Sequence, residues 1–399
     1  MNLAGKKILL GLTGGIACYK AAELARGLVK AGAGVQVVMT EASRHFITPV
    51  TMQALSGKPV YTDQWDSRIS NNMAHIDLSR EADLILIAPC SADFMRKLVH
   101  GAADDLLSTL CLARPSTVPL LVAPAMNVEM WENPATKRNA DQLRADRVVL
   151  LGPASGDQAC GETGLGRMLE PDQLLEALSA FFQPKRLAGR HVMITAGPTF
   201  EPIDPVRGIT NLSSGKMGYA IARAAHAAGA TVTLVSGPTT LQTPLGVTRV
   251  PVTTAREMHE AVMSEITAYD LFIAVAAVAD WRVASVSEQK IKKQAGQTPT
   301  LQFEQNPDIL ASVAALPSPP YCVGFAAESE DLLRQGAAKR EKKGIPLLVG
   351  NIGHQTFGRD DNALVLFDEH GHQSLARASK ETLAIRLIEE ISRRLPAKT

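Results

Sequence analysis

The apolar residues of the chain gather in short, unbroken runs, and polar or glycine-rich residues follow each run. The runs in the first half are KKILLGLT (6–13), GVQVVMT (34–40), LILIAP (84–89), PLLVAP (119–124) and VVLLGP (148–153). Continuous apolar runs are typical of parallel strands that helices cover on both faces. A helix is expected between the first two runs, and residues 170–182 predict a closing helix. The first half therefore predicts an open parallel sheet.

The same pattern restarts after a polar break that contains proline and glycine, QPKRLAGR (183–190). The second set of runs is HVMITAG (191–197), TVTLVSG (231–237), LFIAVAAVAD (271–280), YCVGFAA (321–327) and PLLVGN (346–351). A glycine-opened helix is expected over 211–230, and a last helix from about Ser379. We predict an α/β protein with two doubly wound, Rossmann-like domains, residues 1–189 and 190–399.

Composition narrows the class of protein. The 399 residues include 41 basic and 40 acidic side chains, and this balance argues against a nucleic-acid binder. The five cysteines show no CxxC spacing, which indicates a reduced, cytoplasmic protein. The N-terminal apolar run is too short for the core of a signal peptide, and residues 271–279 have about half the length of a membrane span. We expect no membrane association.

Candidate chemistry follows the strands, because open α/β sheets bind ligands beyond the carboxyl ends of their strands. In GLTGGIACYK (11–20), Gly14 and Gly15 let the backbone approach a phosphate, and a helix N-terminus favours an anion by about 0.3–1 kcal/mol. A tight turn without a ligand is the alternative, since the turn is neither GxGxxG nor a Walker loop. In APCSADF (88–94), Ser91 and Asp93 suit a helix cap, a phosphate site or the edge of a flavin.

Two further candidates lie in the first half. SGDQACGETGLGR (155–167) holds four glycines, which is typical of a mobile loop that can act as a lid. Carboxylates near Cys160 favour its neutral thiol, whose reference pKa is about 8.5. Cys160 is therefore either a proton donor or an inert loop cysteine. His75 is a lone histidine, with a structural or a catalytic role.

PAMNVEMW (124–131) directly follows a predicted buried strand. A plain surface loop would favour glycine, serine and aspartate, but here one amide, Asn127, stands among thioethers and a tryptophan. This composition predicts the lining of a half-apolar pocket with a single polar recognition group.

In the second half, NLSSGKMG (211–218) offers backbone N–H groups and Lys216 to an anion. It is not a Walker loop, because Met217 stands in place of the magnesium-binding hydroxyl. Lys339 and Lys343 are four residues apart and share a face on a helix. Several such lysines suit a polyphosphate, whereas a solvated face is the alternative. The remaining candidate stretches are KIKK (290–293), NPDIL (306–310) and GFAAE (324–328).

Together these stretches resemble the bacterial bifunctional phosphopantothenoylcysteine decarboxylase/phosphopantothenate–cysteine ligase family of coenzyme A synthesis. The likeness covers nearly the whole chain in one order. In the first half it rests on GGIACYK, His75, PAMNVEMW and ACGETGLGRM. In the second half it rests on TAGPTFEPIDPVR, ITNLSSGKMG, AAVADWR, KIKK, NPDIL and GFAAE.

For the first domain, the resemblance implies a flavodoxin-like decarboxylase in which FMN accepts electrons from the cysteine part of the substrate. Carbon dioxide then leaves and the enethiolate is reduced. The resemblance assigns His75 to the oxidation and decarboxylation half, Asn127 to the substrate carboxylate and Cys160 to protonation of the enethiolate. General-acid help of this kind contributes about 10²–10⁴ in rate. The implied FMN-binding positions are Gly14, Gly15, Ile16, Thr40, Ser91, Ala92 and Asp93.

For the second domain, the resemblance implies a Rossmann-like ligase. CTP would convert the carboxylate of 4'-phosphopantothenate into an acyl-cytidylate, and the amine of L-cysteine would displace CMP. Asn211 matches the residue that holds the acyl-cytidylate, and Lys290 matches a residue that contacts the nucleotide phosphates. Mg²⁺ is expected to offset the triphosphate charge, and the sequence does not identify its ligands. The implied nucleotide positions are Ala274, Val275, Ala276, Asp280, Asn306, Pro307, Asp308, Ile309, Phe325, Lys339 and Lys343.

The resemblance also implies a homo-oligomer, with trimers of the first domain, dimers of the second and a dodecamer overall. The flavin site would lie at a subunit contact. Two other functions are considered. A nicotinamide-dependent oxidoreductase is disfavoured because neither glycine turn is GxGxxG. A non-catalytic flavoprotein that regulates a partner is disfavoured because His75, Asn127 and Cys160 occur together.

Overall fold

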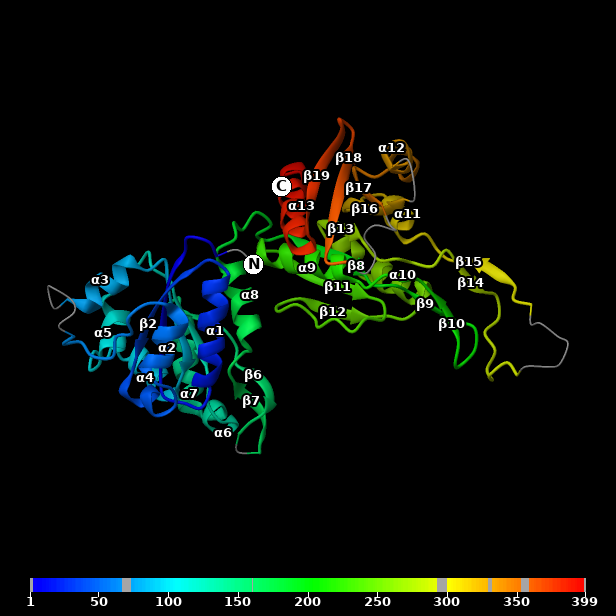
Figure 1. Ribbon diagram of the computed structural model, residues 1–399. Coiled ribbons are helices and arrows are strands. Elements are labelled where there is room, and N and C mark those ends of the chain that lie inside the picture. Colours follow the sequence, from blue (N-terminus) through cyan, green and yellow to red (C-terminus); the bar gives the residue numbers. More distant parts are fainter. Residues whose placement is uncertain are drawn as a thin grey trace. The chain divides into compact units, whose positions relative to one another are not determined.

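The computed structural model describes residues 3–66, 73–159, 161–292, 300–328, 332–352 and 359–397. The chain divides into two compact units, Met1–Ser179 and Ala180–Thr399, which we call the N-terminal and the C-terminal unit (Figure 1). The division falls within helix α8 (Pro171–Phe181), ahead of the predicted boundary at residue 189. Both units are built on a largely parallel sheet covered by helices, which confirms the predicted α/β class.

The N-terminal unit contains a five-stranded sheet in the order β2-β1-β3-β4-β5, with every pair parallel. This order is that of the flavodoxin-like fold. The strands are β1 (Lys7–Leu12), β2 (Gly34–Met39), β3 (Leu84–Cys90), β4 (Leu120–Pro124) and β5 (Val149–Leu150). All seven residues of β3 are buried, which explains its unbroken apolar run.

Helices connect these strands. They are α1 (Cys18–Lys30), α2 (Pro49–Ser56), α3 (Ala74–Glu81), α4 (Ala92–Val99), α5 (Leu106–Ala113), α6 (Val128–Glu132), α7 (Pro134–Ala145) and α8, with a short 3₁₀ helix, η1 (Glu41–His45). Thr40, Ser91 and Asn127 follow β2, β3 and β4, and each accepts a backbone hydrogen bond as the N-cap of the next helix. Such a cap stabilises a helix by about 0.5–2 kcal/mol. Predicted site residues therefore also build the carboxyl edge of the sheet.

The glycine-rich stretch that the sequence predicts as a mobile loop forms an antiparallel hairpin, β6 (Ala154–Asp157) and β7 (Thr163–Arg167). The hairpin packs on the residues that precede α6, where the Met126 N–H donates to the Gly166 carbonyl over 2.9 Å. Gly166 has a φ of 135°, and a Cβ there would meet the Met126 carbonyl oxygen at 2.5 Å. This close approach requires glycine. Cys160 lies outside the described residues.

The C-terminal unit contains an eight-stranded sheet in the order β12-β11-β8-β13-β16-β17-β18-β19. Its strands are β8 (His191–Ala196), β11 (Thr231–Ser236), β12 (Thr248–Pro251), β13 (Leu271–Ala274), β16 (Tyr321–Glu328), β17 (Leu347–Ile352), β18 (Asp361–Asp368) and β19 (Gly371–Ser379). The strands from β12 to β17 in this order pair in parallel. Strands β18 and β19 add to one edge of the sheet as antiparallel strands. The runs did not predict β19, because most of its residues are exposed and its sequence contains no apolar run.

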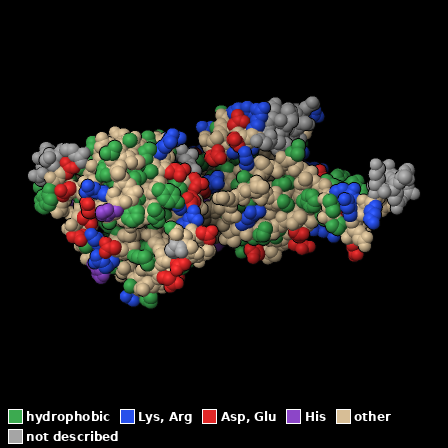
Figure 2. Space-filling view, turned by 60° about the horizontal axis from the view of Figure 1, so that its bottom comes forward, with side chains coloured by type: hydrophobic (Ala, Val, Ile, Leu, Met, Phe, Trp, Pro, Cys, Tyr) green, Lys and Arg blue, Asp and Glu red, His purple; other side chains and the backbone are tan. Residues whose placement is uncertain are grey.

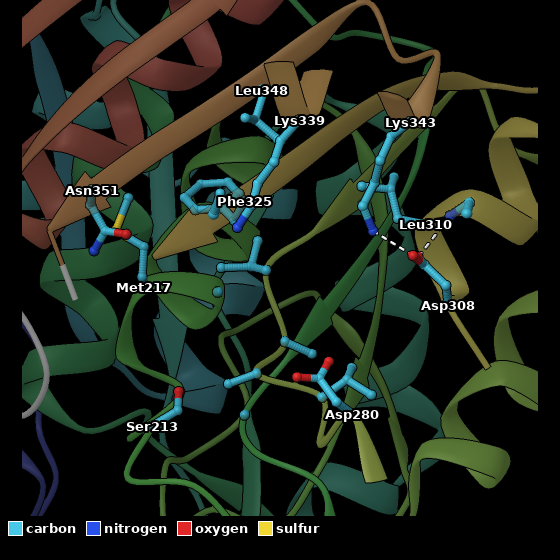
Figure 3. A pocket seen from close by; sticks show the side chains of 18 of the residues that line it. Ser213, Met217, Asp280, Asp308, Leu310, Phe325, Lys339, Lys343, Leu348 and Asn351 are labelled. Carbon is cyan, nitrogen blue, oxygen red and sulfur yellow. Dashed lines mark hydrogen bonds and ion pairs between the residues drawn. The ribbon is translucent and has the colours of Figure 1, made fainter. Parts of the chain in front are cut away.

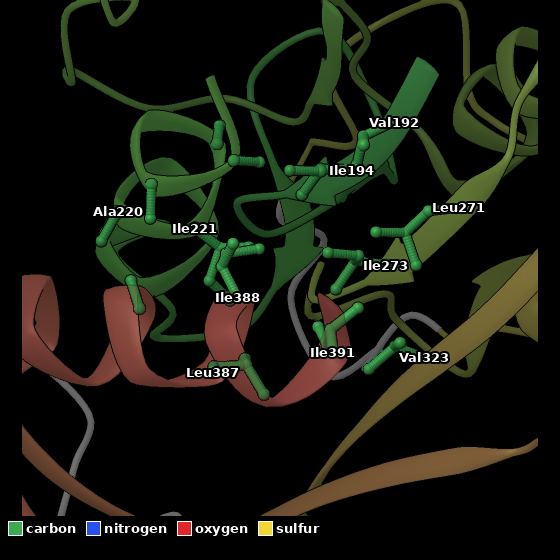
Figure 4. Close-up of a cluster of buried hydrophobic side chains, with 14 of the residues drawn as sticks. Val192, Ile194, Ala220, Ile221, Leu271, Ile273, Val323, Leu387, Ile388 and Ile391 are labelled. Carbon is green, nitrogen blue, oxygen red and sulfur yellow. The ribbon is translucent and has the colours of Figure 1, made fainter. Parts of the chain in front are cut away.

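The helices of this unit are α9 (Lys216–Ala227), α10 (Ala255–Glu265), η2 (Ile266–Ala268), α11 (Ile309–Ala314), α12 (Leu332–Lys343) and α13 (Lys380–Arg394). In the core, Ile221 of α9 and Ile388 of α13 pack on strand residues such as Ile273 (Figure 4). Each such buried side chain stabilises the fold by about 1.5–3 kcal/mol. Helix α9 starts later than the expected residue 211, because Gly215, at a φ of 75°, ends a turn that precedes the helix.

Two short antiparallel ribbons project from the body of the C-terminal unit (Figure 1). They are β9 (Phe200–Pro202) with β10 (Gly208–Thr210), and β14 (Trp281–Val283) with β15 (Phe303–Gln305). We call the described residues 200–210, 281–292 and 300–305 the arm. Basic and apolar side chains are exposed together on it (Figure 2).

Buried Asp204 joins the two parts of the arm, because its carboxylate pairs with Arg207 and accepts the Ile291 N–H.

Candidate functional sites

The N-terminal unit has a cavity of about 640 Å³ at the carboxyl edge of its sheet. Six of the residues predicted from the sequence line it: Gly14, Gly15, Ile16, Ser91, Ala92 and Asn127. Other walls come from the β6–β7 hairpin and from Met126 and Met130. The lining is mainly apolar, with a few polar groups that converge from three strand ends, as expected of a site for a flat organic ligand.

The floor of this cavity is made by two turns that are hydrogen bonded to each other. Thr13, before the glycine turn, donates its hydroxyl to the Pro89 carbonyl over 2.8 Å and accepts the Ser91 N–H over 2.9 Å. A Cβ on Gly14 would meet the Ala42 side chain at 2.7 Å, so the backbone can run here only as glycine. The two predicted candidate turns therefore form one surface with exposed backbone groups.

Asn127 presents its amide to the rim of the cavity. Its carbonyl oxygen accepts the Met130 N–H over 3.1 Å, which fixes the side chain as the N-cap of α6. Its NH₂ group donates to the Glu162 carboxylate of the hairpin. Gln158 binds the same region, since its side chain accepts the Val128 N–H over 2.9 Å. The amide is thus held in one orientation and is already bound to a carboxylate.

Three predicted residues of the first domain do not line the cavity. Thr40 is buried and holds η1 against β1, with its hydroxyl 3.3 Å from the Leu12 carbonyl. The Asp93 carboxylate is exposed and pairs with Arg96 over 2.9 Å. His75 is half-buried on α3, which lies at the opposite end of the unit from α6 (Figure 1). One copy of the chain therefore does not bring His75 to Asn127.

The sequence did not single out two basic residues that line this cavity, Lys20 and Arg167. Lys20 is only 3% exposed, and its ammonium donates to the Met168 carbonyl over 3.0 Å and to Glu170 over 2.8 Å. Arg167 binds the same carboxylate over 2.8 Å. Burial alone would raise the pKa of Glu170, but the two cations outweigh it and lower that pKa. The network ties the end of the hairpin to α1.

The second cavity, of about 940 Å³, lies in the C-terminal unit, where residues that follow β8 and β13 and residues of β16 and β17 line it (Figure 3). Seven of the predicted nucleotide positions line it: Val275, Ala276, Asp280, Asp308, Phe325, Lys339 and Lys343. Figure 3 shows Lys339 beside the Phe325 ring, whereas the Asp280 carboxylate comes from the opposite wall. An aromatic face next to ammonium groups suits a base and its phosphates.

Lys343 and Asp308 form an ion pair of 2.6 Å at the wall of this cavity. Asp308 also caps α11 by accepting the Ala311 N–H over 3.0 Å. Burial would raise the pKa of Asp308, but the hydrogen bond from Lys343 and the cap outweigh it and lower that pKa. The ion pair therefore connects α12 to the start of α11 across the cavity wall.

Other predicted residues of the second domain stand next to the cavity rather than in its lining. Asn306 is buried and donates to the Ala279 carbonyl over 2.8 Å, which shapes the segment before Asp280. Pro307 lines a separate, open hollow of about 530 Å³ together with Asn306. The remaining two of this group are Ala274, which ends β13, and Ile309, which packs in the core.

The two predicted catalytic residues of the second domain differ in position. Asn211 donates its amide to the carbonyl of Ala277, a residue of the cavity wall, and accepts the Ser213 N–H over 2.9 Å. It therefore adjoins the cavity. Lys290 is exposed on the arm and is not among the lining residues.

Lys216 and Lys380 also line this cavity, as does Lys342 of α12. Lys216 pairs with Asp360 over 2.5 Å, and Lys380 donates to the Arg359 carbonyl over 2.5 Å. Lys380 is 6% exposed. Its burial lowers its pKa, and the positive charge of Lys216 lowers it further. The stretch NLSSGKMG (211–218) predicted Lys216 as a group that binds an anion, whereas Lys380 is distant from every motif.

Among the described residues, no group of three or more His, Cys, Asp or Glu side chains is arranged so that it could hold a metal ion. The structure therefore assigns no ligands to the expected Mg²⁺.

Among the described residues, none of the helices has the length and apolar character needed to cross a bilayer.

Comparison with known proteins identifies both units. The model of the family described as "Flavoprotein" matches residues 1–183, and the model of the "DNA/pantothenate metabolism flavoprotein C-terminal domain" matches residues 187–395. The coenzyme A biosynthesis bifunctional protein CoaBC of Vibrio cholerae is 52% identical over 388 residues, which cover 96% of this chain and 97% of the relative. The protein of the same name from Vibrio parahaemolyticus is 50% identical over 395 residues and 98% of both chains. That from Escherichia coli K12 is 48% identical over 405 residues, 100% of this chain and 99% of the relative.

The fold and these matches define a two-domain α/β protein of the flavoprotein class. The chain belongs to the family of bifunctional coenzyme A biosynthesis proteins. The resemblance seen in the motifs is thereby confirmed, and the match of both domains argues against a nicotinamide oxidoreductase and against a flavoprotein that only regulates a partner.

Proposed function

We propose that the chain joins L-cysteine to 4'-phosphopantothenate in its C-terminal unit and decarboxylates the product in its N-terminal unit. Family membership supports the pair of activities. The structure supports their separation, because each unit has its own cavity at the carboxyl edge of its own sheet. The two cavities also differ in chemistry, with a basic lining in one and a mainly apolar lining in the other.

The ligase reaction needs an activated carboxylate. A carboxylate oxygen of 4'-phosphopantothenate attacks the α-phosphorus of CTP, and pyrophosphate leaves. The cysteine amine then attacks the acyl carbon, and CMP leaves. Phe325, Lys339 and Lys343 are in a position to hold the nucleotide, and Asn211 adjoins the wall where the acyl-cytidylate would form.

The N-terminal cavity fits FMN. The glycine turn allows the backbone to approach a phosphate, and Ile16, Ala92 and Met126 offer apolar surface to a planar ring. When bound, FMN supplies the acceptor for the two electrons that the cysteine part of the substrate loses before decarboxylation.

One observation carries the decarboxylase assignment. The Asn127 amide, held as a helix cap, donates to the carboxylate of Glu162. The same neutral donor can therefore hold the substrate carboxylate without the strong ground-state stabilisation that a cation would give. Cys160 as the acid that protonates the enethiolate stays a prediction, since this residue lies outside those the structure describes.

A homo-oligomer, of which the dodecamer is the predicted form, would complete the flavin site. His75 and Asn127 lie at opposite ends of one N-terminal unit, so a second copy is needed to bring them together. Ile16 and Tyr19, on the rim of the cavity, are 63% and 60% exposed, and Trp281 and Phe303 on the arm are 55% and 52% exposed. Exposed apolar groups of this kind are expected at contacts between copies.

A cytoplasmic setting fits the four described cysteines, which are free and buried.

Two assays on one purified preparation test the proposed function. We expect pyrophosphate release from CTP that requires both 4'-phosphopantothenate and cysteine, followed by release of carbon dioxide. We also expect a yellow protein that releases FMN on denaturation. A colourless protein, or pyrophosphate release that ignores cysteine, would contradict the assignment.

A further inference from the structure

The turn that connects β9 to β10 on the arm carries a buried carboxylate, that of Asp204, which is 1% exposed (Figure 1). Its Oδ1 atom accepts the N–H groups of Val206 and Arg207, each over 2.9 Å. Its Oδ2 atom accepts the Arg207 Nε–H over 3.0 Å and the Ile291 N–H over 3.1 Å. One oxygen therefore closes the turn, and the other binds a segment that lies 87 residues further along the chain.

The same turn binds that segment on both sides of Lys290. The Ser287 N–H donates to the Ile203 carbonyl over 3.0 Å. The Arg207 guanidinium donates to the Ile291 carbonyl over 2.8 Å, so the turn binds both polar backbone groups of Ile291. Lys290 itself is exposed. Its backbone is thus held at residues 287 and 291, while its side chain stays open to a ligand.

We propose that Asp204 is a positioning residue for the ligase, which holds the backbone at Ile291 and thereby sets the place from which Lys290 reaches the nucleotide phosphates. This inference rests on the proposed ligase function and extends it, because the predicted site residues include Lys290 but no group that places it. Asp204 is not among the residues that line the cavity, so it acts through Lys290 and not on a substrate.

The burial of Asp204 explains why the bridge is rigid. The side chain of Asp204 is fully buried, and a buried carboxylate without partners would destabilise the fold. Arg207 supplies the opposite charge, and three backbone N–H groups fill the other acceptor positions. Because every one of these donors comes from the turn or from Ile291, the segment can leave the turn only if a buried charge loses a partner.

The turn also connects Lys290 to the edge of the cavity. Strand β10 ends at Thr210, the residue before Asn211, and the Thr210 hydroxyl donates to the Thr199 carbonyl over 2.8 Å. Asn211 in turn donates to the carbonyl of Ala277, a residue of the cavity wall. The β9–β10 ribbon therefore joins a predicted residue next to the cavity to the segment of Lys290, and a shift of that segment would move Lys290 relative to Asn211.

Asp204→Asn separates the two contributions of the carboxylate. The amide oxygen can still accept the N–H groups of Val206 and Arg207, which keeps the turn closed. The NH₂ group is itself a donor, and it replaces the oxygen that accepts the Ile291 N–H. We therefore expect the variant to keep its turn and to lose its hold on Ile291.

Trypsin reports on the position of the segment, because it cleaves after Lys290 only when the backbone there leaves the turn. In Asp204→Asn, cleavage of the native full chain after Lys290, followed by mass spectrometry, should be about tenfold faster, the effect of one lost hydrogen bond to a charged group. Cleavage after Arg186, outside the arm, should keep its rate. Unchanged cleavage after Lys290 would overturn the proposal.

Asp270→Asn is the matched control for both measurements. Asp270 also joins a backbone N–H, that of His191, to an arginine, Arg190, but it lies outside the arm. The control should leave cleavage after Lys290 and the rate of ligation as in the wild type. Faster cleavage after Lys290 in this variant would indicate a general loss of stability and would count against a specific hold by Asp204.

A double-mutant cycle tests whether Asp204 acts through Lys290. With CTP, 4'-phosphopantothenate and cysteine, Asp204→Asn should lower the kcat of pyrophosphate release by about 10²-fold, since a displacement of about 1 Å can have an effect of this size. In the background of Lys290→Gln, the same change should lower the remaining rate by less than about twofold. The loss is expected to disappear there because the group that Asp204 places is already gone.

Other results would overturn the positioning role. An equal loss of rate in both backgrounds would mean that Asp204 supports the arm as a whole and not Lys290. An unchanged rate in Asp204→Asn would mean that the position of the segment does not matter for ligation. If the wild type releases no pyrophosphate, the proposed ligase function fails, and cleavage after Lys290 still tests whether Asp204 holds the segment.

Discussion

The two units place a cavity at the same point of the same kind of sheet, yet they build it from different groups. In the N-terminal unit, helix caps such as Ser91 and Asn127 and a glycine turn supply neutral donors to a mainly apolar hollow. In the C-terminal unit, lysines on three helices, among them Lys216, Lys343 and Lys380, surround a larger hollow. The topology fixes where a ligand binds, and the residues that follow the strands decide which ligand it is.

The largest effect is expected from Asn127→Asp. The new carboxylate would repel both Glu162 and the substrate carboxylate, so decarboxylation should fall by about 10²-fold or more, while pyrophosphate release continues. Measurement of both products in the same reaction checks this. Asn133→Asp is a matched control, because Asn133 also caps a helix in this unit but lies outside the cavity lining. Equal loss in the two variants would remove the proposed role of Asn127.

A smaller effect is expected from Lys343→Gln in the other unit. The change removes one of the α12 ammonium groups and leaves Asp308 without its cationic partner, so the KM for CTP should rise by about tenfold. Decarboxylation of supplied phosphopantothenoylcysteine should be unaffected. Steady-state kinetics with each substrate varied in turn tests the separation of the units, which a parallel fall in decarboxylation would contradict.

The smallest effect is expected on stability. In Gly166→Ala, the added Cβ would meet the Met126 carbonyl oxygen at a residue with positive φ, so the free energy of unfolding should fall by about 1–3 kcal/mol. Gly161→Ala is the control for backbone strain alone, since its φ is also positive but no atom lies within 4 Å of the new Cβ. Denaturant unfolding of both variants measures the difference. If the two variants lost equal stability, the close approach of the hairpin to Met126 would contribute nothing.

The sequence predicted those parts of the fold that depend on local pattern. Unbroken apolar runs such as 84–89 became buried strands, and motifs that follow strands, such as the one around Asn127, reached a cavity. Lys339 and Lys343, placed on one helical face by their spacing, line the same hollow.

Long-range packing decides the features that the sequence did not show. Lys20 and Lys380 are buried lysines whose partners, Glu170 and Arg359, could be recognised only in the folded chain. The exposed strand β19 lacks an apolar pattern, and the close approach of the β6–β7 hairpin to Met126 depends on the missing side chain of Gly166. His75 is not among the residues that line the cavity of Asn127, and a second copy of the chain that would bring the two residues together stays a prediction.

Removal of the flavin tests most directly whether one chain carries two independent centres. The flavin-free protein would be supplied with CTP, 4'-phosphopantothenate and cysteine, and pyrophosphate and carbon dioxide would be measured together. The separate cavities predict pyrophosphate release close to the rate of the flavin-containing protein, no carbon dioxide, and recovery of decarboxylation when FMN is added back. Loss of pyrophosphate release along with decarboxylation in a protein that remains folded would contradict two independent centres.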